Sequence, residues 1–428
     1  MRSVWQETSL PRFPQLDGDL KTDVLIIGGG IAGILTAYFL QQNGVKYVLA
    51  EKDRICCENT CGTTAKITAQ HGLIYSKLIK SGGIRTARGY LDANLAALRK
   101  YAEMCRAIDC DYELKDNFVF SSSRSRLESE MDALERIGYG AELCEKLPLP
   151  VKTAGAVKFP RQAQFDPLKF INGIVGDLNI YENTHVLGMD GKTALTGSGR
   201  ILADRVVCAT HYPFINRHGA YFLKLYQHRS YVIALENAGD VDGMYVDESS
   251  SGLSFRNQKS LLLLGGGGGR TGKKNAGWEF LRGFAGEHYP EAEEKYFWAA
   301  QDCMSLDSIP YIGRYSRRTP ELYVETGFNK WGMTSSMLSA MLVSDMLLGR
   351  KNDFADVFDP SRSILKPQLF VNGFEAVSNL LTPSKKVCPH MGCALKWNEA
   401  ERTWDCPCHG SRFSEDGTVI NNPSNADI

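Results

Sequence analysis

Two short boxes of cysteine and histidine lie near the C-terminal end of the 428-residue chain. The first box reads Cys388-Pro389-His390-Met391-Gly392-Cys393, and the second reads Cys406-Pro407-Cys408-His409-Gly410-Ser411. Two thiolates on one iron and two imidazoles on the other are the ligands of a Rieske-type [2Fe–2S] centre. The spacing therefore predicts four cluster ligands, which are Cys388, His390, Cys406 and His409.

A structural zinc ion is the alternative occupant of these boxes, because zinc also binds two cysteines and two histidines in a tetrahedron. Cys393 and Cys408 favour the iron–sulfur cluster, since a zinc site needs no further thiol at those places. Colour separates the two interpretations, because an iron–sulfur cluster absorbs visible light and zinc does not.

A second group of residues, near the N-terminal end, has the spacing of a nucleotide site. Gly28, Gly30 and Gly33 lie between a predicted strand and a predicted helix, and Glu51 ends the next strand. Such glycines let the backbone approach a pyrophosphate at the helix N-terminus, while the acid accepts a hydrogen bond from a ribose hydroxyl. This spacing does not separate FAD from NAD. A one-electron centre in the same chain favours FAD, because a flavin converts between hydride and single-electron transfer.

Hydrophobic periodicity indicates the elements that must position these groups. Residues 23–27 and 45–50 predict buried parallel strands around a helix at 34–40, which is a βαβ opening. Further helices are expected at 84–108, 127–137, 278–288 and 291–300, with short strands at 184–210 and 230–264. The pattern weakens over residues 351–384, which predicts a connector.

Composition bounds the class of protein. The chain is 43% hydrophobic and 23% charged, as in an ordinary globular protein. Its 49 basic and 49 acidic residues balance, which gives no field to attract nucleic acid or an anionic membrane, so small-molecule or protein partners are expected. The first seven residues lack the apolar core of a secretory signal, and glycines at 28–33 interrupt the longest apolar stretch. We therefore expect a cytoplasmic location and no transmembrane segment.

Much of residues 5–350 resembles the D-amino-acid oxidase-like (DAO) family of FAD-dependent oxidoreductases. The segments that carry the resemblance are 23–52, Gly62-Thr63-Thr64-Ala65, Gln164-Phe165-Asp166-Pro167, 206–210, 306–313 and 326–334. The resemblance implies an α/β + β fold: a Rossmann-like, glutathione-reductase-type FAD domain, an interleaved antiparallel substrate sheet, and a small C-terminal Rieske β domain. Within residues 1–350 it places the FAD part at about 20–80, 150–212 and 305–350, and the substrate or cap part at 81–149 and 213–304. The connector at 351–384 then leads to a Rieske domain at 385–428.

The same resemblance assigns residues to the cofactor. A strand near 184–186 would hold the adenine, and the turn at 327–334 would lead into a helix whose N-terminus faces the flavin. The residues expected at FAD are Gly28, Gly30, Ile31, Ala32, Gly33, Glu51, Lys52, Thr63, Thr64, Val186, Thr210, Gly327, Trp331, Gly332, Met333 and Thr334.

The C-terminal boxes resemble those of the Rieske proteins of respiratory cytochrome bc-type complexes. This resemblance implies a disulfide between Cys393 and Cys408, and a hydrogen bond from Ser411 to a bridging sulfide. Those proteins usually carry a tyrosine two residues after this serine, where this chain has Phe413. We therefore predict a lower reduction potential, because a hydrogen bond to the ligand cysteine sulfur is missing. Flavoproteins with a fused Rieske tail form a recognisable subgroup of the family.

The substrate side departs from the family pattern. Amino-acid oxidases of the family carry a carboxylate-binding arginine where this chain has Gln301 and Asp302. We therefore expect an amine or amino-acid-like substrate, with Asp302 either at its cationic group or in a structural role. Arg256 is the other candidate, as a carboxylate clamp or as part of a surface ion pair. His71 and Tyr231 are expected near the substrate on family position alone.

Two further patterns invite functional interpretations that we do not favour. Cys56, Cys57 and Cys61 lie in the loop expected near the pyrophosphate, so a second metal site is not predicted there. Residues 267–273 approach a phosphate-binding loop, but Lys274 stands where a serine or threonine is required. The five successive glycines instead suggest close approach of a neighbouring backbone.

Together these features predict an oxidoreductase that takes hydride from a small amine or amino-acid-like substrate onto FAD. Electrons would then pass singly through the Rieske cluster to an external protein or quinone. The alternative is an NAD(P)H-driven electron-transfer component that feeds a partner oxygenase. No second glycine-rich strand–turn–helix suited to a nicotinamide nucleotide is found in the sequence, which favours the first interpretation.

Overall fold

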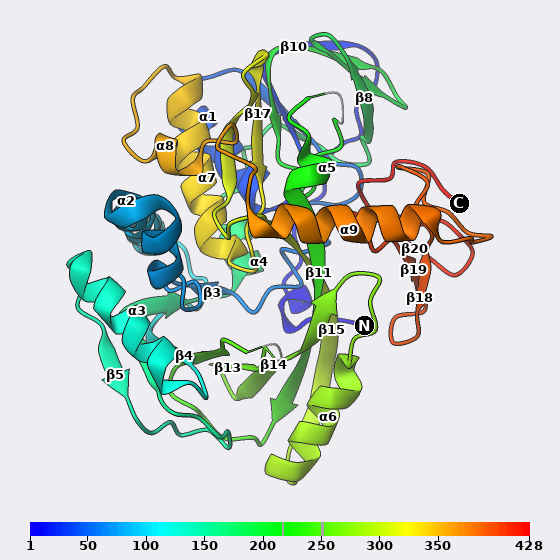
Figure 1. The fold of residues 1–428 in the computed structure, drawn as a ribbon. Helices are drawn as coiled ribbons and strands as arrows, with labels where there is room; N and C mark the ends of the chain where they lie inside the picture. Colours follow the sequence, from blue (N-terminus) through cyan, green and yellow to red (C-terminus); the bar gives the residue numbers. More distant parts are fainter. Residues whose placement is uncertain (216–217, 250–251) are drawn as a thin grey trace.

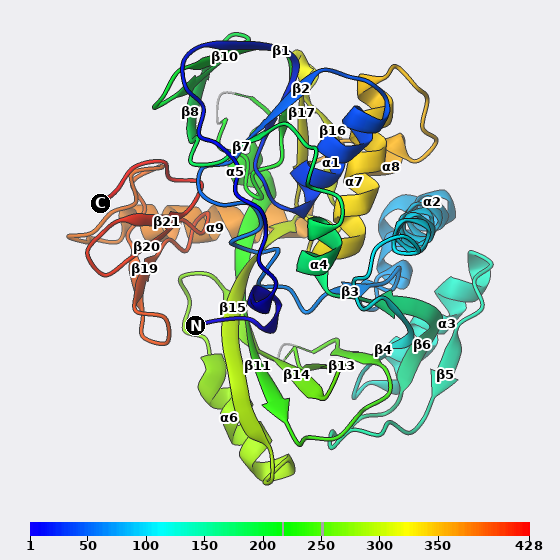
Figure 2. The same cartoon turned by 180° about the vertical axis from the view of Figure 1, so that it is seen from behind.

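The computed structural model describes residues 1–215, 218–249 and 252–428. Two large sheets meet along the middle of the molecule, and a small third sheet packs on one side of them (Figure 1). Figure 2 shows the molecule from the opposite side. Strands from the N-terminal half of the chain belong to both large sheets.

The first large sheet is mainly parallel and has the order β16-β17-β10-β1-β2-β7, with β9 on β10 and β8 on β9. Its strands are β1 (Leu20–Ile27), β2 (Tyr47–Ala50), β7 (Ile180–Tyr181), β8 (Val186–Asp190), β9 (Thr193–Thr196), β10 (Arg200–Cys208), β16 (Tyr311–Ser316) and β17 (Thr319–Thr326). Helix α1 (Ile31–Gln42) packs against α7 (Gly332–Leu347) beside this sheet. The predicted βαβ opening is thereby confirmed.

Glycine is required where β1 turns into α1. Gly28 has a φ of 110°, and a Cβ there would lie 2.6 Å from the carbonyl oxygen of Ala209. A Cβ on Gly33 would lie 2.0 Å from the oxygen of Gly28, so only glycine lets the helix start this close to the strand. The turn therefore brings the N-terminus of α1 against the edge where β1 and β10 end.

The second large sheet has the order β15-β11-β14-β13-β12-β4-β6-β3, with β5 on β6. Its strands are β3 (Lys66–Ile67), β4 (Glu113–Phe120), β5 (Glu142–Cys144), β6 (Ala156–Gln164), β11 (Leu225–Glu236), β12 (Met244–Asp247), β13 (Ser254–Gln258), β14 (Leu261–Arg270) and β15 (Glu293–Ser305). The helix expected at 291–300 is wrong. These residues form β15, because the long strand β11 offers a ladder of backbone partners from residue 293 to residue 305.

The remaining helices surround the two sheets. They are the short η1 (Val4–Glu7), α2 (Tyr75–Met104), α3 (Arg124–Arg136), α4 (Pro167–Asn172), α5 (Tyr221–Lys224), α6 (Gly277–His288), α8 (Ala355–Phe358) and α9 (Pro367–Leu381). Helix α2 begins nine residues before the expected one, with a non-helical Gly83 inside it. None of the described helices is both long and apolar enough to cross a membrane.

The C-terminal part forms a four-stranded antiparallel sheet of β18 (Lys396–Asn398), β19 (Thr403–Asp405), β20 (Arg412–Phe413) and β21 (Val419–Asn421). Helix α9 fills much of the segment expected to be a connector and runs across the surface toward this sheet (Figure 1). Each hydrogen-bonded pair of neighbours in the small sheet is antiparallel.

Candidate functional site

A cavity of about 600 Å³ lies where the two large sheets meet. Of the sixteen residues predicted at FAD, all line this cavity except Gly33 and Thr334. Gly33 lies behind the wall, against the backbone of Gly28. Thr334 donates a hydrogen bond from its hydroxyl to the oxygen of Thr68, at 2.9 Å, and accepts one from the Thr68 N–H, at 3.0 Å.

The nucleotide end of the cavity has the groups that a dinucleotide requires. The Glu51 carboxylate lies at the end of β2, where it accepts hydrogen bonds from the N–H of Gly29, at 2.6 Å, and of Asp53, at 3.0 Å. Burial raises the pKa of Glu51 to about 7. A Cβ on Gly30 would meet only the Thr60 hydroxyl, at 3.6 Å, so the wall stays open in front of α1. These residues fit a pyrophosphate beside the α1 N-terminus and a ribose beside Glu51.

At the other end of the cavity, Trp331 stacks on His71 with ring centroids 4.9 Å apart. His71 is held in turn by the Tyr90 hydroxyl at 2.6 Å and the Thr68 oxygen at 2.7 Å. Burial lowers the pKa of His71 to about 3, so its ring is neutral. His71 therefore supports the wall at the start of α7, and its two ring nitrogens already have protein partners.

Polar side chains from β11 and β15 line the part of the cavity that faces away from the nucleotide end. Asp302 accepts a hydrogen bond from the Ser230 hydroxyl, at 2.9 Å. The Lys330 side chain also lines this part of the cavity. Protein surrounds it, but water in the cavity can reach it. Burial lowers the pKa of Lys330, and the Asp302 carboxylate opposes that effect. Sequence reasoning missed Lys330, although it lies inside the segment 326–334 that carried the family resemblance.

Two other candidates occupy different positions. Arg256 lies outside the cavity wall and is fully buried, where it donates to the oxygens of Thr64, at 3.0 Å, and Ala65, at 3.1 Å. Burial lowers the pKa of Arg256 to about 9. Its guanidinium thus supports the loop that carries Thr63 and Thr64, and it is not part of a surface ion pair. Tyr231 contributes to the cavity wall and packs against Trp278.

The four predicted cluster ligands lie in two turns beside the small sheet, one before β18 and one after β19. The rings of His390 and His409 are perpendicular, with centroids 5.0 Å apart, and Cys388 and Cys406 are both buried. His409 Nε2 lies 3.1 Å from the Phe222 oxygen, which leaves Nδ1 unpartnered among the described residues. An imidazole held by one nitrogen with the other free is the arrangement of a metal ligand.

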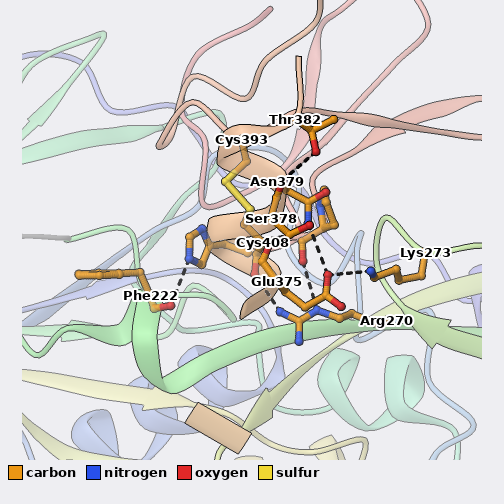
Figure 3. The surroundings of a disulfide bond; sticks show 11 residues. Phe222, Arg270, Lys273, Glu375, Ser378, Asn379, Thr382, Cys393 and Cys408 are labelled. Carbon is orange, nitrogen blue, oxygen red and sulfur yellow. Dashed lines mark hydrogen bonds and ion pairs between the residues drawn. A yellow bond between two sulfur atoms is a disulfide. The ribbon is translucent and has the colours of Figure 1, made fainter. Parts of the chain in front are cut away.

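The geometry favours two irons over a single zinc. No three of the four predicted ligands bring their ligand atoms within 4.8 Å of one another, as a single tetrahedral ion would require. The sulfurs of Cys393, Cys406 and Cys408 are that close, but Cys393 and Cys408 form a disulfide and are unavailable to metal (Figure 3). Cys56, Cys57 and Cys61 form no such group in the part of the chain that the structure describes.

Ser411 lies beside the ligand cysteine Cys388. Its hydroxyl oxygen accepts a hydrogen bond from the Ser424 N–H, at 3.0 Å, and the hydroxyl also makes a hydrogen bond with the side chain of the ligand Cys388. Phe413 is fully buried in an apolar cluster that includes Cys388 and Cys406. Its ring therefore packs in the same cluster as the two ligand cysteines.

Replacing Phe413 by tyrosine is expected to raise the midpoint potential of the cluster by about 60 mV. One hydrogen bond to the ligand sulfur, favouring the reduced state by about tenfold, accounts for a shift of that size. A redox titration followed by electron paramagnetic resonance (EPR) measures it. Phe284→Tyr, on α6, is the control, and an unmoved midpoint in Phe413→Tyr would contradict the assignment.

The Rieske domain packs on the wall of the cavity itself. Along β11, the side chains of Tyr226, His228 and Ser230 line the cavity. The alternating Gln227 and Arg229 point to the other face, where Gln227 donates to the His409 oxygen at 3.2 Å. On β15, Asp302 lines the cavity while Gln301 donates to the Gly410 oxygen at 2.8 Å. Gln301 thus holds the Rieske domain, while its neighbour Asp302 faces the cavity.

The five successive glycines of β14 serve the same close packing. A Cβ on Gly268 would lie 2.0 Å from the Arg229 oxygen, where the antiparallel pairing of β14 with β11 shifts register, so only glycine fits there. Just beyond β14, a Cβ on Gly272 would lie 2.6 Å from the Pro407 nitrogen. The expected close backbone approach is confirmed, and it extends to the second cluster box.

The nucleotide cavity lies between the two large sheets, and the cluster site packs against the wall of that cavity. Together these two sites define a flavin-dependent oxidoreductase that carries a Rieske centre. The chain belongs to the FAD dependent oxidoreductase (DAO) family, whose model matches residues 23–346. The Rieske [2Fe-2S] domain model matches residues 363–428. The resemblance inferred from the sequence is confirmed, and FAD and the Rieske cluster are the cofactors.

Among known proteins, the chain is similar over its whole length to the "Putative Rieske 2Fe-2S iron-sulfur protein YhfW" of Bacillus subtilis (strain 168). The two are 33% identical over 99% of this chain and 96% of the relative. A 38-residue part is 47% identical to the cytochrome b6-f complex iron-sulfur subunit of Nostoc punctiforme, covering 9% of this chain and 21% of that one.

Solved structures share the fold of the flavoprotein part. Glycine oxidase from Geobacillus kaustophilus aligns with a TM-score of 0.67 and 18% identity, covering 80% of this chain and 99% of that one. L-Proline dehydrogenase from P. horikoshii aligns with a TM-score of 0.67 and 16% identity, covering 82% and 98%. At these identities the likeness shows the fold alone.

Proposed function

We propose that this oxidoreductase is a dehydrogenase for a small amine or amino-acid-like substrate, whose electrons leave singly through the Rieske cluster to an external protein or quinone. When bound, FAD supplies a hydride acceptor and the cluster supplies a one-electron carrier. The names of the structural neighbours, a glycine oxidase and an L-proline dehydrogenase, support the choice of substrate class.

The observation that carries this proposal is the shared wall between the cavity and the cluster box. Thr210 lines the cavity, and two residues later the ring of Tyr212 lies 6.3 Å from the ring of His409. Asn422 of the Rieske domain also lines the cavity and donates to the oxygens of Thr210, at 2.8 Å, and Tyr212, at 2.7 Å. Protein packed this closely on both sides supports electron transfer between the two centres within one chain.

Two side chains of opposite charge support recognition of a zwitterionic substrate. Asp302 would accept from a cationic nitrogen, while Lys330 would donate to a carboxylate. Both project into the water-accessible part of the cavity, and Ser230 orients the Asp302 carboxylate. The substrate would be held by Asp302 and Lys330, because Gln301 and Asp302 stand where amino-acid oxidases of the family carry their carboxylate-binding arginine.

The experiment that tests the proposal is anaerobic EPR after mixing the holoprotein with amines, amino acids or NADH. A reduced Rieske signal with an amine or amino acid, but not with NADH, is the expected result. A signal with NADH alone would replace the proposal by the electron-transfer alternative.

Substitutions of Asp302 and Lys330 should distinguish amine substrates from amino-acid substrates. Asp302→Asn is expected to raise KM by about 10- to 100-fold for every substrate with a cationic nitrogen, because a charge-assisted hydrogen bond is lost. Lys330→Met should do so only for substrates that also carry a carboxylate. Steady-state kinetics with an amino acid and its decarboxylated amine measure both effects. Equal KM values for wild type and Asp302→Asn would remove Asp302 from the site.

We further propose a cytoplasmic location for the protein. Eight cysteines outside the Rieske domain are unpaired thiols, since ten cysteines are free and two of those are Cys388 and Cys406. Free thiols in this number are typical of a reducing compartment.

A further inference from the structure

Helix α9 has its polar side turned toward the protein and its apolar side turned outward. The only buried residues of the helix are Asn372 and Asn379. Asn372 accepts a hydrogen bond from Arg270, at 2.8 Å. Glu375 forms an ion pair with Lys273, at 2.7 Å (Figure 3). The usual orientation of a surface helix is therefore reversed.

The outer face of α9 is a continuous apolar stripe. Phe370, Phe374, Val377 and Leu381 follow one another at intervals of four, three and four residues, which places them on one side of a helix. Their exposed fractions are 72%, 73%, 57% and 77%. We call these four residues, with Val371, the outer α9 stripe. Large apolar side chains gathered in this way mark a surface that binds something.

The stripe continues to the edge of the cluster box. Val387 and Met391, which flank the ligand Cys388, are exposed by 46% and 42%. A small cavity of about 100 Å³, lined by Leu380, Met391 and His409 among others, joins α9 to this edge. Whatever covers the stripe therefore also lies beside the cluster.

Charge around the stripe selects the kind of partner. Glu375 is the only charged residue of α9, and it faces Lys273. Lys366 and Lys385 stand at the two ends of the helix, and neither has an ion pair among the described residues. The outward face is thus apolar with a lysine at each end and no acid, which complements an anionic lipid surface.

A second copy of the chain fits this face less well. In an antiparallel pair of α9 helices, Lys366 of each copy would face Lys385 of the other, and in a parallel pair each lysine would face its equivalent. Both arrangements juxtapose like charges at both ends of the contact. A helix of this length, about 22 Å, is also too short to span a bilayer but suits one that lies along it.

We propose that the outer α9 stripe, together with Val387 and Met391, docks the protein on an anionic lipid bilayer with α9 lying in the plane of the interface. Docking of this kind turns the His390 and His409 edge of the cluster box toward the membrane. The inference stands apart from the proposed reaction, because binding to lipid requires neither substrate nor turnover.

Flotation of the full-length holoprotein with vesicles tests the proposal. Phosphatidylcholine vesicles containing about one-third phosphatidylglycerol should bind the protein, and vesicles of phosphatidylcholine alone should bind it at least about tenfold more weakly. The double variant Phe370→Ser/Phe374→Ser should bind the anionic vesicles at least about tenfold more weakly than wild type. Lys366→Gln/Lys385→Gln should lose affinity by a similar factor.

The matched control is Leu187→Ser/Leu202→Ser, two exposed leucines on β8 and β10, which should bind like wild type. Visible spectra of flavin and cluster show whether each variant is folded. Equal vesicle binding by wild type and by the double phenylalanine variant would overturn the proposal, as would no binding by wild type. So would a wild-type dimer in sedimentation velocity that the phenylalanine variant dissociates, because a second copy would then cover the stripe.

Discussion

Replacing His409 by alanine is expected to abolish the Rieske EPR signal and to lower turnover with a one-electron acceptor by at least about 100-fold. Loss of an outer-shell partner of a metal ligand already costs 10- to 100-fold, so loss of the ligand itself should cost more. Anaerobic reduction of the flavin by substrate should persist, because His409 does not line the flavin cavity. EPR, stopped-flow absorbance and acceptor-coupled turnover measure the three quantities on the same sample.

His288→Ala, on α6, is the matched control, because it removes an imidazole that belongs to neither site. It should retain the signal and the turnover. A second ligand variant, Cys406→Ser, guards against local misfolding in His409→Ala, since it alters one sulfur only. Wild-type turnover in a variant without cluster would mean that electrons leave the flavin directly.

Replacing Glu401 by glutamine is expected to destabilise the docked Rieske domain by about 3–5 kcal/mol, because it leaves the buried Arg229 guanidinium without a carboxylate. Arg412 loses one of its two carboxylate partners and keeps Asp405, at 3.1 Å. Glu401 is 1% exposed, and its partners Arg229 and Arg412 are 4% and 6% exposed. Arg229 belongs to β11, while Glu401 and Arg412 belong to the Rieske part. This buried group of charges therefore joins the small sheet to the cavity wall.

Denaturant titration, with the visible circular dichroism of the cluster as the probe, measures this loss. Glu415→Gln is the matched control, since Glu415 and its partner Arg402 are 61% and 70% exposed. An exposed pair contributes no more than about 1 kcal/mol. Equal losses in the two variants would show that the buried pair does not hold the domain.

The same residue gives the docking a pH dependence. Burial alone would raise the pKa of Glu401, but Arg229 and Arg412 outweigh it and hold that pKa below its usual value. Because the pKa of Glu401 is lower in the folded protein than the usual glutamate value of about 4.3, the ionised carboxylate stabilises the folded state fully above that usual value. This stabilisation is lost as the pH falls through the pKa that Glu401 has in the folded protein. The free energy of unfolding of the wild type should therefore fall in acid. Glu401→Gln lacks the carboxylate at every pH, so its free energy of unfolding should fall less over the same range.

Residue types and short-range spacing were sufficient for both cofactor sites. Metal ligation and close backbone approach each allow few residue types. The short segments around Cys388 and Cys406, and the glycines after β1, therefore indicate their function without knowledge of distant residues. Strand β15 could not be predicted in this way. Its residues favour helix locally, and only the long partner β11 makes them a strand.

The sequence by itself determined the class of the protein: a flavin site, a Rieske site and the order of the two along the chain. Only the tertiary structure decided which side chains of β11 and β15 face the flavin cavity and which face the Rieske domain. Gln301 and Asp302 are neighbours in sequence, yet one holds the Rieske domain and the other faces the cavity. In the same way, only the tertiary structure showed that Arg256 lies outside the cavity and that Lys330 lines it. The reason is that a side chain's partners depend on the packing of distant segments, which local spacing does not encode.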